Sequence, residues 1–317
     1  MDVYIEHLDY YLPNSRLYFK DHVEYFNSNK DFFETAQKFI DYSKKTLGLE
    51  SVIVETKKTL EEMVLHLLEK NISAGSIVFE EIDYILIAPD LDKQLKDLEI
   101  QIIKKYKITK ANILRVSQNY CVNIDVAIGM ACKLLSKERN IKKILVISGS
   151  KLDYSLKERI VGGYGVMGDA AGLILLSGNR QSGILKVCEQ NVLNEVGNDS
   201  NTLKEGSAFL HLKAYLQCLN SLGNLKDENI DSIILHNANH LLIEEALTYA
   251  GLDIRKIYKI NQKKYGHLGT TDLILNLTTY LAYSKNDSSI LSLNLGISGT
   301  YVATIFRKYN HIEVTVN

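Results

Sequence analysis

The sequence predicts an α/β protein in which helices cover a parallel or mixed sheet. Short runs rich in β-branched residues, such as IDYILIAPD (82–90), alternate along the chain with longer amphipathic runs, such as TKKTLEEMVLHLLEKN (56–71). Apolar residues spaced three and four apart indicate helices, and short apolar runs between turn residues indicate strands. The 317 residues include only two prolines and no low-complexity linker, so we expect one continuous body with a large core.

The order of the predicted elements restarts near the middle of the chain. In the first half we expect strands at 3–12, 82–90, 112–118, 142–150 and 170–178, and helices at 56–71, 95–108 and 122–137. In the second half we expect strands at 184–193, 231–239, 256–261, 288–295 and 300–308, and helices at 203–221, 241–252 and 272–283. The repetition predicts two related α/β halves, residues 1–177 and 178–317.

Charge and cysteine content exclude several classes of protein. Lysine and arginine number 37 against 38 acidic residues, which gives no basic surface for nucleic acid or an anionic membrane. No apolar run approaches the roughly 18 to 20 residues of a membrane span, and the acidic N-terminus does not resemble a signal peptide, so we expect a cytoplasmic protein. The four cysteines contain no CxxC pair, which argues against a disulfide framework and a zinc site.

Cys121 is a candidate nucleophile. It follows a predicted strand and stands where the helix at 122–137 begins. The positive end of a helix dipole lowers the pKa of a thiol, which favours the reactive thiolate. Free cysteine is also among the most buried residue types, so packing in the core is the alternative interpretation, and it is the one we adopt for Cys132.

The segment LHNANH (235–240) is the second candidate. It follows an apolar strand, and functional groups of α/β proteins gather at the carboxyl ends of strands. His236 is suited to act as a general base or as a hydrogen-bond donor to an oxyanion. The alternative is a helix cap, with Asn239 capping the following helix, and His240 is predicted to lie at the surface or in the first helical turn.

The turn YGHLGTTD (265–272) is the third candidate, because it places His267 and Asp272 among small residues ahead of an apolar helix. Asp272 is also well placed simply to stabilise the N-terminus of that helix. A fourth, glycine-rich segment, GGYGVMGDAAG (162–172), lacks the lysine of a phosphate-binding loop and precedes a strand, so it is a poor nucleotide site.

Taken in order, these motifs resemble the β-ketoacyl-acyl-carrier-protein synthase III group of the thiolase superfamily. The resemblance extends along nearly the whole chain, through DYYLPNSRL, the segment around Cys121, GDAAGLILL, HNAN, YGHLG and LGISGTYVA. It implies a five-layered αβαβα fold, a homodimer, and an acyl thioester that acylates Cys121 next to His236. It also implies that Asp169 in GDAAG has an architectural role.

One position departs from the family and changes the expected activity. The family has Asn where this chain has His267, and that Asn assists carbon-carbon bond formation. A minor branch resembles acyltransferases with a Cys-His-Asp triad, and Asp272 fits its aspartate. The resemblance therefore implies a triad of Cys121, His236 and Asp272, in which the carboxylate orients the imidazole as it does in serine hydrolases.

The resemblance further implies an oxyanion hole from the backbone of Cys121 and of Gly296 or Ile297, with Asn239 in support. It implies no resident cofactor, because the phosphopantetheine of an acyl carrier protein or coenzyme A arrives with the substrate. The chain has no tryptophan to stack on an adenine, which favours a carrier-protein donor, and the lysine-rich SKERNIKK (136–143) is either its docking site or a solvated surface.

Three functions remain open at this stage. The first is an acyltransferase that moves an acyl group to a small hydroxyl, amine or thiol acceptor, as in natural-product biosynthesis. The second is a decarboxylating condensing enzyme in which His267 or Asn239 replaces the usual Asn. The third is a silent subunit of a heterodimer, which the retention of Cys121 and His236 disfavours.

Overall fold

The computed structural model describes residues 2–22, 35–91, 94–152, 155–181, 183–194, 207–225 and 228–308. The main strands are β1 (Val3–Tyr11), β4 (Tyr84–Pro89), β5 (Asn112–Arg115), β6 (Lys143–Ser150), β9 (Ala170–Ser177), β10 (Leu185–Asn194), β11 (Ile230–Ile234), β12 (Ser289–Gly296) and β13 (Thr300–Lys308). The shorter strands are β2 (Ser15–Tyr18), β3 (Ser51–Val54), β7 (Ile160–Val161) and β8 (Gly165–Val166). The α-helices are α2 (Ala36–Tyr42), α3 (Leu60–Ser73), α4 (Leu98–Tyr106), α5 (Asn123–Lys137), α6 (Leu156–Arg159), α7 (Ser207–Asn220), α8 (Leu241–Tyr249), α9 (Ile260–Tyr265) and α10 (Asp272–Leu281).

The sheet shows the internal repeat directly. Nine strands lie in the order β11-β12-β13-β10-β1-β9-β6-β4-β5, and β1 joins β10 at the centre. Outward from the centre, the first half runs β1-β9-β6-β4-β5 and the second half runs β10-β13-β12-β11. Each half starts with two antiparallel pairings and continues with a parallel one, and the first half adds a second parallel pairing between β4 and β5. The two halves therefore share one topology, whereas the predicted boundary at residue 177 stays a prediction.

The strand predicted at 256–261 is wrong. Only Ile257 pairs, through a single parallel bridge to Ile233 of β11, and α9 begins at Ile260. Ile257 occupies the place in the second half that β5 holds in the first. The outermost strand of the second half is thus reduced to one bridge, because the chain turns into helix on both sides of it. The predicted helix at 203–221 is present as α7, and its first four predicted residues lie outside the described residues.

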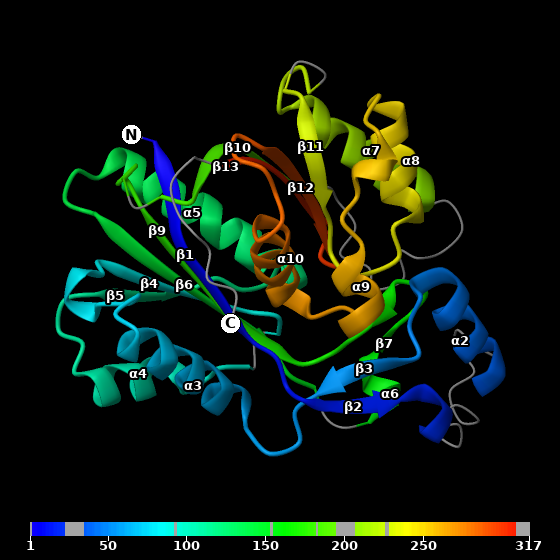
Figure 1. Cartoon of the computed structure of the whole chain (residues 1–317), viewed down its shortest axis with the longest axis horizontal. Helices are drawn as coiled ribbons and strands as arrows, with labels where there is room; N and C mark the ends of the chain where they lie inside the picture. The colour runs from blue at the N-terminus through cyan, green and yellow to red at the C-terminus, as the bar shows by residue number, and fades with distance from the viewer. Residues whose placement is uncertain are drawn as a thin grey trace.

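Helices and sheet form five layers (Figure 1). One core contains α5 and α10 together with strands of both halves. A second packs α3 and α4 on the outer face of the first half, and a third packs α7 and α8 on the outer face of the second half. The predicted αβαβα architecture is confirmed, and α5 and α10 contribute to the same central core.

A local sequence signal starts α3. Thr59 and Glu62 form a reciprocal capping box that begins α3, and the buried face of this helix follows the apolar spacing.

Asp169 is fully buried, pairs with the equally buried Arg159, and accepts hydrogen bonds from the backbone of Glu55 and Leu152. This carboxylate ties four segments together, which is the architectural role expected of it.

Within the described residues, no helix is both long and apolar enough to cross a bilayer.

All four cysteines are free thiols. Cys132 packs against the central core, as predicted, and burial raises the pKa of its thiol to about 12. Cys121 is buried and lies close to the loops that carry the two candidate histidines.

Candidate active site

Cys121 stands in a tight turn that feeds the N-terminus of α5. The 3-10 turn Tyr120–Val122 leads directly into Asn123, and Tyr120 has a left-handed backbone conformation with φ of 54°. Such a conformation is strained for a residue with a Cβ, and strain of this kind concentrates at functional sites. The side chain of Asn123 fastens the turn by bonding to the Pro89 carbonyl and accepting from the Asn119 backbone. The turn therefore holds the thiol in a defined position at the helix start.

His267 is placed by the backbone of its glycine-bounded turn. Its N–H donates to the Val166 carbonyl at 3.0 Å, and its own carbonyl accepts from Gly168 at 2.7 Å. Gly266, with φ of 76°, lies so close to Val52 and Val166 that an added Cβ would fall 2.7 and 2.8 Å from their atoms. Only glycine fits both the conformation and the space, which explains the residue before His267.

Asp272, the first residue of α10, holds His267 rather than His236. Its Oδ2 lies 2.5 Å from Nδ1 of His267. The same carboxylate accepts from the backbone and the side-chain amide of Asn237, and from the backbone N–H of Leu268, each at 2.8 Å. The predicted contact with His236 is wrong. The physical reason is local, since five residues of one tight turn bring His267 and Asp272 together.

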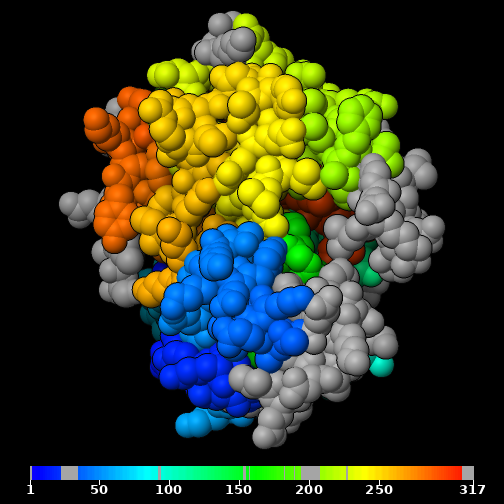
Figure 2. All heavy atoms as spheres, turned by 90° about the vertical axis from the view of Figure 1, so that its right-hand side faces the viewer, coloured from blue at the N-terminus to red at the C-terminus, as the bar shows by residue number. Residues whose placement is uncertain are grey.

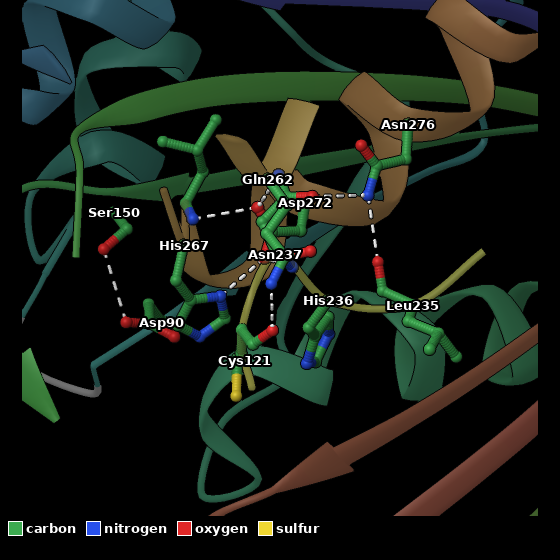
Figure 3. A network of polar contacts seen from close by, with 12 residues as sticks. Asp90, Cys121, Ser150, Leu235, His236, Asn237, Gln262, His267, Asp272 and Asn276 are labelled. Carbon is green, nitrogen blue, oxygen red and sulfur yellow. Dashed lines mark hydrogen bonds and ion pairs between the residues drawn. The ribbon is translucent and has the colours of Figure 1, made fainter. Parts of the chain in front are cut away.

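Three side chains converge on one point from separate elements (Figure 3). The thiol of Cys121 and ring nitrogens of His236 and His267 all lie within 4.8 Å of one another. The thiol donates to the carbonyl of Leu295 at 3.4 Å, and the rings of His236 and His267 are 5.3 Å apart. Because Nδ1 of His267 is held by Asp272, Nε2 is the nitrogen left to exchange a proton with Cys121.

Burial and neighbouring charges shift the pKa values of Cys121, His267 and His236 in different directions. Burial raises the pKa of the Cys121 thiol, and the interaction with His267 opposes that rise. Burial would lower the pKa of His267, but the negative charge of Asp272 outweighs it and raises that pKa well above its usual value. For His236, burial and the nearby His267 lower the pKa well below the usual value. His267 is thus the histidine suited to hold a proton, and His236 stays neutral.

His236 has no hydrogen-bond partner for either ring nitrogen among the described residues. The buried side chain therefore retains a donor and an acceptor beside the thiol. A neutral imidazole N–H in this position can donate to an oxygen that develops charge during acyl transfer. His236 is thus in the right place for the oxyanion role that the sequence left open, and not for the triad role.

The remaining predicted residues lie around this cluster with different roles. Gly296, at the end of β12, packs on the backbone of Asn119, where a Cβ would meet the carbonyl oxygen at 2.2 Å. The turn that contains Gly296 and Ile297 thus lies beside the Cys121 turn, and the side chain of Ile297 is half exposed. Asn239 bonds to Tyr42 and Gly163 and accepts from Leu241, so it fastens loops and does not reach the thiol.

The prediction that His240 lies at the surface or in the first helical turn needs correction. His240 is buried and is the residue that precedes α8, where its Nε2 contacts the His236 carbonyl at 2.6 Å. Burial lowers the pKa of this imidazole to about 4. It therefore supports the HNAN loop as a neutral side chain.

Sequence reasoning missed Asp90, a buried carboxyl at the site. It follows β4 directly and receives a bond from the Ser150 hydroxyl at 3.3 Å. The carboxyl of Asp90 packs on Gly269, where a Cβ on residue 269 would lie 2.7 Å from Cγ of Asp90. Burial raises the pKa of Asp90 to about 6, against the opposing charge of His267. The internal repeat offered a signal for Asp90. β4 in the first half corresponds to β11 in the second half, so the segment after β4 corresponds to the segment that carries His236.

Asp125 is a second buried carboxyl, one helical turn after Cys121 in α5. Its Oδ1 accepts from Asn294 at 2.9 Å, and its Oδ2 has no partner among the described residues. Burial raises the pKa of Asp125 to about 7. The folded protein therefore keeps a proton on Asp125 between about pH 4 and 7, where the unfolded chain has lost it, so rising pH destabilises the fold in this window.

Replacing Asp125 by Asn is expected to remove this pH dependence. From pH 5 to 8 the wild type should lose about 2 to 3 kcal/mol of unfolding free energy relative to the variant. The loss accrues between pH 5 and the folded-state pKa of about 7, at about 1.4 kcal/mol per pH unit. Urea denaturation of both proteins at pH 5 and pH 8 measures the difference. Equal losses in the two proteins would contradict a buried, protonated Asp125.

Comparison with known structures shows the same fold. First, the architecture is thiolase-like. The solved structure of ChlB3, described as an acyltransferase, has a TM-score of 0.77 at 16% identity and covers 99% of this chain and 100% of that chain. The 3-oxoacyl-[acyl-carrier-protein] synthase III of Aquifex aeolicus VF5 has a TM-score of 0.74 at 17% identity, covering 96% and 99%. A variant of OleA from Xanthomonas campestris, bound to cerulenin, has 0.76 at 12% identity, covering 97% of each.

Second, residues 221–308 match the family model of the 3-oxoacyl-[acyl-carrier-protein (ACP)] synthase III C-terminal region. No curated protein sequence matches the chain. This C-terminal match and the shared fold agree with the predicted resemblance to the synthase III group. The matched region contains the HNAN loop, the His267 turn and Asp272, and a Cys-His-Asp triad fits the geometry around Cys121.

Proposed function

We propose that the chain is an acyltransferase that carries an acyl group on Cys121 and passes it to a hydroxyl, amine or thiol acceptor. The observation that carries this proposal is the contact of Asp272 with Nδ1 of His267 beside the thiol. A carboxylate in this position fixes the imidazole tautomer and stabilises the imidazolium, as in a Ser-His-Asp triad. The triad is thus Cys121, His267 and Asp272.

The proton can be followed through both half-reactions. In the first, Cys121 attacks the thioester carbonyl and its proton passes to Nε2 of His267, which then protonates the departing thiol. In the second, His267 takes the proton of the acceptor as it attacks the acyl-Cys121 carbonyl, and returns it to the Cys121 sulfur. The neutral His236 donates to the carbonyl oxygen in both steps, in addition to the backbone donors proposed at Cys121 and Ile297.

Substrates and assembly belong to the same proposal. The acyl donor is a thioester of an acyl carrier protein or coenzyme A, so the chain needs no resident cofactor. The acceptor is a small molecule, as in a natural-product or fatty-acid-like pathway, and the protein acts as a homodimer. The absence of tryptophan favours the carrier protein, and the residues Ser136–Asn140 of the lysine-rich segment are exposed where such a protein could dock.

Decarboxylating condensation is the second candidate, because two histidines lie next to the nucleophile. The rings of His236 and His267 both approach Cys121, and a pair of donors there can stabilise an enolate as well as an oxyanion. The firm hold of Asp272 on His267 favours acyl transfer. That carboxylate makes His267 a base, whereas stabilising an enolate requires two hydrogen-bond donors and no base.

Intact-protein mass spectrometry after incubation with a panel of acyl thioesters tests the proposal. We expect one acyl adduct on the wild type, none on the Cys121→Ala variant, and loss of the adduct when a suitable acceptor is added. Malonyl thioester should release no carbon dioxide. Carbon dioxide released in step with malonyl consumption would instead establish condensation, and an adduct that persists without Cys121 would refute the nucleophile.

A further inference from the structure

Tyr164 lies at the tip of a hairpin that is joined to the His267 turn. The hairpin consists of β7 and β8, and Tyr164 is in its turn. The carbonyl of Tyr164 accepts from the Asn239 backbone at 2.6 Å, and the backbone of Val166 at the hairpin end accepts from His267. The glycine-rich segment, which the sequence makes a poor match to a nucleotide site, thus connects the two histidine loops and brings one aromatic side chain to the active site.

The phenol of Tyr164 is packed on the catalytic imidazole. Its ring meets the ring of His267 edge to face, with centroids 5.6 Å apart and planes at 87°. The ring of His267 also faces the ring of His236, with centroids 5.3 Å apart. Cys121, Asp272 and Asp90 are close enough that their charges act on the phenol. Tyr164 and His236 therefore both approach the group that transfers protons.

The hydroxyl of Tyr164 is buried, and it has no hydrogen-bond partner among the described residues. The residue as a whole is only partly buried. Burial raises the pKa of this phenol well above its usual value, so it remains a neutral O–H donor. A buried donor without a partner reduces stability, and phenylalanine would pack here without that penalty.

The surface view shows how a substrate could approach this donor. In Figure 2 the face that carries α2 and α8 is hollowed between them, and green atoms, the colour of residues near 160, lie in the hollow. Dark red atoms, the colour of the chain near residue 300, border them. Parts of the chain near residues 160 and 300 thus come to the surface at one place.

We infer that Tyr164 is a substrate-binding residue whose hydroxyl donates a hydrogen bond to an oxygen atom of a substrate held at Cys121. This inference rests on the proposed acyltransferase function. The oxygen belongs either to the acyl donor, as a hydroxyl or keto group near the thioester, or to the acyl acceptor. A donor buried beside the reacting groups favours substrates that carry such an oxygen over purely hydrocarbon ones, because only the former pair with it.

Tyr164→Phe tests the inference, and Tyr106→Phe is the matched control. Tyr106 also has a buried hydroxyl without a partner among the described residues, but it packs on Phe79 in the outer layer of the first half. Each substitution removes one oxygen atom. Two rates are measured by intact mass: acylation of Cys121 by a thioester alone, and transfer from the isolated acyl-enzyme to the acceptor. Melting temperatures of both variants are measured alongside.

We expect Tyr164→Phe to slow one of the two half-reactions about tenfold, while its melting temperature stays equal to that of the wild type or rises. Slower acylation assigns the oxygen to the acyl donor, and slower transfer assigns it to the acceptor. Tyr106→Phe should change neither rate. The inference is overturned if both rates of Tyr164→Phe match those of Tyr106→Phe, or if its loss of activity follows a fall in melting temperature. A wild type that forms no acyl adduct would overturn the proposed function, and this inference with it.

Discussion

His267→Asn is expected to lower the overall rate of acyl transfer roughly 10⁴-fold, the upper range for loss of a general acid-base group. Asn keeps a hydrogen-bond donor but cannot accept and return a proton. Cys121, whose pKa burial already raises, would also lose the neighbour that opposes this rise. Steady-state kinetics with one thioester and one acceptor measures the effect.

The same variant separates the two candidate functions. Asn is the residue that the condensing members carry at this position, so a condensing enzyme would tolerate the change. We expect His267→Asn to lose transfer to hydroxyl, amine or thiol acceptors and to remain folded, since the backbone bonds of residue 267 do not involve the side chain. Retention of transfer activity within about tenfold of the wild type would contradict a base at this position.

Asp272→Asn is expected to lower turnover on the order of 10³-fold with little change in KM. The amide keeps the shape of the carboxylate, but it removes the charge that raises the pKa of His267. Both carboxylate oxygens accept from N–H donors, so the NH₂ group that replaces one of them faces a donor in either orientation, and the tautomer of His267 is no longer fixed. The pH-rate profile should shift as well, because a less basic His267 titrates at lower pH.

Destabilisation must be separated from loss of catalysis in this variant. Asn237 is the proper comparison, since its side chain bonds to the same carboxylate and also accepts from Asn276. Asn237→Ala should lower stability by about 1 to 3 kcal/mol through the unpaired partners it leaves, while the charge on Asp272 remains. An Asp272→Asn variant that matches Asn237→Ala in both stability and turnover would reduce Asp272 to a structural role.

Most of the fold was predictable because periodicity reports which face of an element is buried. The strands at 142–150 and 170–178 appear as β6 and β9, and both are buried along nearly their whole length. The failure at 256–261 has a positional cause. An outermost strand is defined by its single neighbour, and the turn before Ile257 and the helix after it leave one bridge. No local pattern shows how long a strand can stay beside its partner.

The membership of the site was predictable, but its pairing was not. Cys121, His236, His267 and Asp272 do lie together. His236 follows β11, Cys121 comes just before α5, and the turn after α9 brings His267 to Asp272 at the start of α10. Which histidine meets Asp272 depends on side-chain directions set by packing. The left-handed glycines at 266 and 269 turn His267 back onto the start of α10. Tyr164 was missed because a single tyrosine carries no spacing, and Asp90 was missed although it directly follows β4, the counterpart of β11 in the second half.

The central claim, that His267 is the base, is tested most directly by chemical rescue of transfer from acylated enzyme. Cys121 is acylated by prolonged incubation in His267→Ala and in His236→Ala, and transfer to an alcohol acceptor is followed with and without added imidazole. We predict that imidazole restores transfer in His267→Ala, where it can replace the missing base, and leaves His236→Ala unchanged, where a positioned donor is missing. Rescue of His236→Ala alone would contradict the Cys121, His267 and Asp272 triad.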